Sequence, residues 1–217
     1  MKINKDELKF ANAFIQEHFE RIIDWAVGDI KRCCRMKEDG TCDDNGALVG
    51  AFILWCCAID YFGGLFTSYT SQGATKARFR SFIKAYMTKY DPDKVIELRW
   101  SLLHFYSPHY FLLYHERNLE QNKSLHLTAS QKGTYLHLGW AVKDLEDAVK
   151  RYWDDLKTND TLKIKAWRYY KEHNPIMPIR IEDFVEQKTF NSLPTGAQIQ
   201  SINVSGTISQ DSWLKPK

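Results

Sequence analysis

The stretch ALVGAFILWCCAIDYFGGLF, residues 47–66, decides how the rest of this 217-residue chain is interpreted. Apolar residues cover nearly every side of a helix built from it, which predicts the central helix of a bundle. Its uncharged run ends at Asp60 after about fourteen residues, shorter than the roughly 20 that cross a bilayer. A charge at the bilayer centre also costs about 2.5 to 3.5 kcal/mol. We therefore favour a buried helix over the alternative, a membrane span.

Other segments show apolar residues at the three- and four-residue steps of a helix with one buried face. The sequence predicts five such helices, at 5–31, 75–89, 93–106, 138–156 and 161–173. Two short alternating runs, SLHLTA at 124–129 and TYLHLG at 134–139, predict at most a small hairpin. The expected fold class is an all-α bundle of about six helices.

The domain organisation follows from length and composition. Residues 1–186 are expected to form one domain, because single domains usually contain about 100 to 200 residues. Residues 187–217 are rich in Gly, Ser, Thr, Asn and Gln, which predicts a polar tail that serves as a linker or docking strand.

Composition narrows the function classes. A net charge of +3 is too mild to indicate a nucleic-acid binder by itself. The five cysteines contain no Cys-x-x-Cys, and the N-terminus lacks the pattern of a secretory signal, so we expect reduced thiols in the cytoplasm. No Gly-x-Gly-x-x-Gly or phosphate-binding loop is present, and we expect no cofactor.

The stretch LRWSLLHFYS, residues 98–107, places Arg99 and His104 in a predicted apolar helix. An arginine can hold a phosphate bidentately, and a histidine can exchange protons near neutral pH. Together they suffice for metal-free RNA cleavage by the adjacent 2′-hydroxyl. Five residues advance a helix by about 500°, so these side chains point roughly 140° apart. The pair then requires a distorted helix, the reach of the arginine side chain or a dimer interface.

Other side chains around this stretch have simpler interpretations. His104, His109 and His115 are never three or four residues apart, and Pro108 interrupts them, so we expect no metal site. The neighbouring aromatic residues are expected in the core or a dimer interface. They are Trp100, Phe105, Tyr106, Tyr110 and Phe111.

The segment TKARFRSFIKAYMTKY, residues 75–90, contains basic and aromatic residues but no acid. This pattern suits phosphate contact and base stacking, so Arg78, Arg80 and Lys84 are candidates to bind an RNA backbone. The alternative is a solvated amphipathic helix.

Three stretches, CAIDYFGGLF (57–66), RFRSFIKAYMTKY (78–90) and LRWSLLHFYS, together resemble the HEPN domain superfamily, in particular its uncharacterised prokaryotic or phage-related members. The Arg-x4-His spacing resembles the superfamily's signature. Many HEPN proteins are metal-independent ribonucleases of toxin, antiviral-defence and RNA-processing systems. The resemblance implies a homodimeric endoribonuclease in which Arg99 contacts the scissile phosphate and His104 acts as acid or base, with an antitoxin as a further candidate partner.

Two alternatives stay open. Trp100 follows Arg99 where active members often carry a small polar residue, which suggests a degenerate, RNA-binding relative. Asp60, the only charge in the most apolar helix, needs a partner such as Arg99, Arg78 or Arg80. In an enzyme Asp60 would orient Arg99 for catalysis. Otherwise Asp60 and Arg99 form a structural ion pair in a non-enzymatic helical protein-interaction module.

Overall fold

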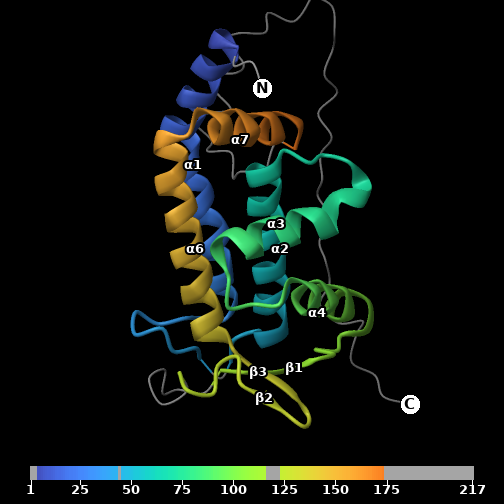
Figure 1. Cartoon of the computed structure of the whole chain (residues 1–217). Helices are drawn as coiled ribbons and strands as arrows, with labels where there is room; N and C mark the ends of the chain where they lie inside the picture. Colours follow the sequence, from blue (N-terminus) through green and yellow to red (C-terminus); the bar gives the residue numbers. More distant parts are fainter. Residues whose placement is uncertain (1–3, 44, 116–122, 174–217) are drawn as a thin grey trace, which may run out of the picture. The chain divides into compact units, whose positions relative to one another are not determined.

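The computed structural model of the chain describes residues 4–43, 45–115 and 123–173 (Figure 1). Within them lie α1 (Lys5–Cys33), α2 (Leu48–Thr67), a 3₁₀ turn (Gln72–Ala74), α3 (Thr75–Tyr86), α4 (Pro92–Phe105), β1 (Phe111–Tyr114), β2 (Ala129–Ser130), β3 (Gly133–His137), α6 (Leu138–Thr158) and α7 (Asp160–Glu172). The predicted all-α bundle with a small β element is confirmed. The predicted domain end at residue 186 and the polar tail lie outside the described residues.

Helix α2 is the central element and packs against α1, α3, α4, α6 and α7. Phe52, Ile59 and Phe62 are fully buried. Trp55 is buried too, and its Nε1 donates to the carbonyl of Ala141 in α6 over 2.8 Å. By length and composition α2 could also cross a membrane, with 20 residues and a mean hydropathy of 1.8. In this structure its apolar side chains form the centre of the core.

Two glycines near the end of α2 let its neighbours approach closely. A Cβ atom at Gly63 would lie 2.6 Å from the carbonyl oxygen of Arg78 in α3. A Cβ atom at Gly64 would lie 2.0 Å from the ring of Tyr169 in α7. Because both distances are far below van der Waals contact, a larger residue at either position would push these helices apart.

The three strands form one sheet in the order β1-β3-β2. β2 and β3 are antiparallel, so the predicted hairpin is present, although its first strand is short. β1 runs parallel to β3, with Phe111 opposite Thr134, and was not expected from the sequence. His137 ends β3 and caps α6, because its side chain accepts the N–H of Trp140 over 3.3 Å.

The turn between α3 and α4 is longer than predicted, since α3 ends at Tyr86 rather than Lys89. Asp91 then caps α4 by accepting the N–H of Asp93 over 2.9 Å, and Pro92 occupies the first turn. α4 ends at Phe105, and the next residue, Tyr106, has a left-handed φ of 53°. The caps at Asp91 and Tyr106 thus fix where α4 begins and ends, and with it the positions of the turn before the helix and of the aromatic residues after it.

Candidate functional site

Asp60, in the most apolar helix, contacts two arginines. Its Oδ1 accepts from Nε of Arg78 over 2.6 Å, and its Oδ2 accepts from Nη2 of the same residue over 3.2 Å. Nη2 of Arg99 lies 3.7 Å from the same Oδ2. The prediction that Asp60 is paired with an arginine is confirmed, and Arg78 is the closer partner.

Arg78 is held inside the protein by contacts on all sides of its guanidinium. Besides Asp60, it donates to the carbonyl of Tyr69 over 3.3 Å and to the hydroxyl of Thr75 over 3.0 Å. Its side chain is 11% exposed. The predicted contact of Arg78 with an RNA backbone is therefore corrected, because a buried charge needs these partners to offset its lost hydration.

Arg99 and His104 leave α4 in different directions. The helix is regular through Phe105, which sets the two side chains about 140° apart. Arg99 extends toward Asp60, its side chain 24% exposed, and its Nε has no hydrogen-bond partner among the described residues. The exposed ring of His104 lies 5.7 Å from that of Trp100. No contact joins Arg99 and His104 in the part of the chain that the structure describes.

The other two predicted phosphate-binding residues of α3 are on its outer side. Lys84 is exposed, and Arg80 is half-exposed with its Nη2 2.7 Å from Oδ1 of Asp93. Residues four apart share a helix face, so Lys76, Arg80 and Lys84 form one basic stripe. The Arg80–Asp93 pair is exposed and therefore weak.

A group of large apolar side chains near the end of α4 faces the solvent. The group comprises Trp100, Leu103, Phe105, Tyr106 and Tyr110, between 46% and 79% exposed, and we call it the α4 surface. Of the aromatic residues expected in the core or a dimer interface, only Phe111 lies in the core of the single chain, and the dimer-interface part of the expectation stays a prediction. Trp100 and Leu103 share one side of α4, whereas Phe105 points about 140° away from Trp100. Exposed apolar side chains that share a face are typical of interaction sites.

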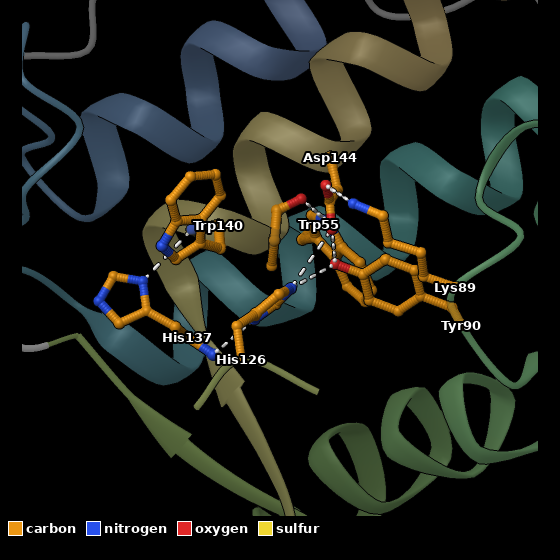
Figure 2. A network of polar contacts seen from close by, with 8 residues as sticks. Trp55, Lys89, Tyr90, His126, His137, Trp140 and Asp144 are labelled. Carbon is orange, nitrogen blue, oxygen red and sulfur yellow. Dashed lines mark hydrogen bonds and ion pairs between the residues drawn. The ribbon is translucent and has the colours of Figure 1, made fainter. Parts of the chain in front are cut away.

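A second polar cluster joins the α3–α4 turn to α6 (Figure 2). The Tyr90 hydroxyl donates to Oδ2 of Asp144 over 3.0 Å, and Nζ of Lys89 lies 3.4 Å from Oδ1. Nε2 of His126 lies 3.1 Å from the Tyr90 oxygen and 3.3 Å from Oδ2 of Asp144. Nδ1 of His126 accepts the N–H of His137 over 3.2 Å, which assigns the proton of the neutral ring to Nε2.

We call the cluster of Lys89, Tyr90, His126 and Asp144 the latch. Burial and the neighbouring Asp144 carboxylate raise the pKa of Tyr90 well above its ordinary value. Burial would also raise the pKa of Asp144, but hydrogen bonds from His126 and Tyr90 and the charge of Lys89 outweigh it, so that pKa is lowered. Since the Tyr90 and His126 side chains are buried, the cluster holds the turn on α6. No sequence motif announced it.

A hollow of about 230 Å³ lies beside the latch, between residues 85–90 and one face of α6. Asp144 and Asp147 line it together with Lys89 and Arg151, and Arg151 donates to the carbonyl of Tyr86. These two acids and two cations balance, so the hollow favours no particular ligand charge.

Within the described residues no group of three or more His, Cys, Asp or Glu side chains is arranged to hold a metal ion. Comparison of the chain with known protein families, curated proteins and solved structures finds no match. The HEPN resemblance therefore stays a prediction.

Proposed function

We propose that this chain is a helical protein-interaction module that pairs with a second copy of itself through the α4 surface. The exposure of Trp100 and Leu103, three residues apart on one side of α4, carries the proposal. Covering apolar area of this kind is favourable, at roughly 25 cal/mol per Å² removed from water. Trp and Tyr are also the residue types that dominate binding energy in interfaces.

The charges along α4 favour a second copy as the occupant. Glu97 and His104 are seven residues apart, an advance of about 700°, so they project from nearly the same side of the helix. Trp100 lies between them. If two α4 helices pair antiparallel around Trp100, Glu97 lies level with the partner's His104. A carboxylate then meets an imidazole at both ends of the aromatic contact.

The oligomeric mass in solution tests this proposal. Sedimentation velocity on the full chain should show a monomer–dimer equilibrium that Trp100→Asp weakens by about 2 kcal/mol or more, which is about thirty-fold in Kd. Phe10→Asp is the matched control, because Phe10 is exposed on α1, outside the α4 surface. A wild-type protein that stays monomeric at all concentrations, or equal effects of both substitutions, would contradict self-pairing through α4.

RNA cleavage by a HEPN-like, metal-independent mechanism is a second candidate, favoured by one observation on Arg99. Its side chain keeps part of its surface in solvent and its Nε lacks a partner in the described structure, while His104 is exposed on the same helix. Cleavage requires a pairing that brings Arg99 of one copy to His104 of the other, because the two side chains point apart on a single helix.

Cleavage of structured RNA in the presence of a chelator separates these candidates. An active protein should produce 2′,3′-cyclic ends, and His104→Ala should abolish them. Equal cleavage by both proteins, or none by either, would sink the enzyme proposal for a toxin or phage-defence role. Binding without cleavage, weakened by Lys84→Ala and by added salt, would instead support a degenerate RNA-binding relative.

A further inference from the structure

Two buried histidines at the junction of β3 and α6 accept hydrogen bonds from backbone N–H groups (Figure 2). Nδ1 of His126 accepts the N–H of His137 over 3.2 Å, and Nδ1 of His137 accepts the N–H of Trp140 over 3.3 Å. We call His126 and His137 the histidine pair. Because both acceptors are buried, the loss of either bond leaves an inner N–H group without its partner.

Both bonds require a neutral ring. One nitrogen of a neutral imidazole carries a proton and the other accepts, whereas an imidazolium donates from both nitrogens and accepts from neither. A second proton on either ring therefore sets two N–H groups against each other, and the bond is lost. A free imidazole takes up this proton at about pH 6.5, so mild acid is sufficient.

The charges that face His126 come from α6 and from the α3–α4 turn. Its Nε2 lies 3.3 Å from Oδ2 of Asp144 in α6, and this carboxylate favours a charged ring. From the turn, the Tyr90 oxygen lies 3.1 Å from Nε2, and Nζ of Lys89 lies 3.4 Å from Oδ1 of Asp144. A protonated His126 therefore keeps its contact with Asp144 and loses only the bond from the N–H of residue 137.

The surroundings of His137 oppose a charged ring instead. His137 caps the N-terminus of α6, where the helix dipole disfavours a cation. Two ammonium groups are near, since Nζ of Lys143 in α6 and Nζ of Lys123 lie 4.8 Å and 5.1 Å from the ring centroid of Trp140. From β1, the ring of Tyr114 packs on His137 with 4.8 Å between centroids. His137 therefore binds a proton more readily when the cap is open than when it is closed.

We propose that the histidine pair is a pH-sensitive switch, which closes the junction of β3 and α6 when both rings are neutral and opens it when they are protonated. With both bonds made, the pair holds neither extra proton, so the open junction binds more protons than the closed one. Lowering the pH through about 6.5 therefore favours opening. The sheet bond from the N–H of Leu127 to the carbonyl of Tyr135 involves no histidine and stays. Neither histidine belongs to the α4 surface, and the inference does not depend on the proposed function.

Amide hydrogen exchange of the full-length wild type, resolved by NMR at about pH 7.5 and about pH 5.5, tests the switch. Protection factors are compared, because they remove the intrinsic dependence of exchange on pH. The amides of residues 137 and 140 should each lose about five-fold in protection at the lower pH, the order of one hydrogen bond. The N–H of Leu162 is the internal control, since it is bonded over 3.2 Å to the Asn159 side chain, a cap that does not titrate. Unchanged protection at residues 137 and 140, or an equal loss at Leu162, would overturn the proposal.

His137→Asn separates the two histidines. Asparagine is a good N-cap whose oxygen accepts the same N–H but takes up no proton. In this variant the amide of residue 140 should keep its protection in mild acid, while the amide of residue 137 should still lose it through His126. His109→Asn is the matched control and should behave like the wild type, because His109 is exposed and asparagine readily adopts its φ of 50°. An acid-dependent loss at residue 140 that is as large in His137→Asn as in His109→Asn would contradict the switch.

Discussion

The core around α2 and the α4 surface use the same kinds of side chain under opposite conditions. Phe82 and Tyr152 are fully buried, with ring centroids 6.0 Å apart in an edge-to-face arrangement. Phe105 and Tyr106 are 79% and 72% exposed. α4 buries its other side against α2 and α3 through residues such as Leu98. The comparison teaches that residue type alone does not separate the core from an interaction surface.

Removing a ring should show the largest difference between the two regions. Phe82→Ala should lower the free energy of unfolding by about 3 to 5 kcal/mol, because it leaves a cavity in the core. Phe105→Ala should change it by about 0.5 kcal/mol or less in the monomer, since no buried contact is lost. Chemical denaturation at low protein concentration measures both. Similar losses for the two variants would break the comparison.

Arg78 and Arg99, which both contact Asp60, should also differ in how much their removal lowers the free energy of unfolding. Arg78→Ala should cost about 3 to 5 kcal/mol of unfolding free energy, because Asp60 then keeps only the 3.7 Å contact with Arg99. Arg99→Ala should cost about 1 kcal/mol or less, since the closer pair stays intact. Thermal and denaturant unfolding of each variant report these values. A larger loss from Arg99→Ala would mean that the assignment of the main partner is wrong.

Loss of the hydroxyl group should lower the free energy of unfolding more at Tyr90 than at Tyr106, by a smaller margin than in the pairs above. Tyr90→Phe removes a hydrogen bond to the Asp144 carboxylate and should cost about 1.5 kcal/mol. Tyr106→Phe alters an exposed hydroxyl and should leave the free energy of unfolding nearly unchanged. Hydrogen exchange can add the location of the effect, since Tyr90→Phe should loosen the α3–α4 turn. Unchanged protection of residues 86–90 would count against the latch.

The latch should also make the free energy of unfolding depend weakly on pH in the acidic range. The pKa of Asp144 is below its ordinary value of 3.8, so its stabilising contribution is fully present above that pH. The contribution is lost as the pH falls below 3.8 and through the lowered pKa. Between pH 5 and about pH 2, the free energy of unfolding should therefore change less with pH for Asp144→Asn than for the wild type. Parallel curves would exclude this role for Asp144.

The helices were predictable because each has a local pattern. The apolar spacing placed α1, α2 and α6 within two residues of their ends. β1 was not predictable, since a short apolar run such as FLLY has no period that separates a strand from other buried structure. The partner that makes it a strand, β3, is defined by pairing rather than by sequence.

The site residues were predictable where one helix determines them. The need of Asp60 for an arginine follows from burial of its charge. Which arginine approaches it depends on how α3 packs on α2 at Gly63, a feature of tertiary structure. The latch of Tyr90, His126 and Asp144 joins three separate segments and has no local signal.

Site-directed cross-linking tests the central claim, that two copies pair antiparallel through α4, most directly. Glu97→Cys and His104→Cys are made separately on a Cys57→Ser background, which removes the exposed native thiol. The account predicts that the mixture of the two variants forms a covalent dimer joined through positions 97 and 104, in larger amount than either variant alone. No covalent dimer in the mixture, or equal amounts in the mixture and in each variant alone, would contradict it.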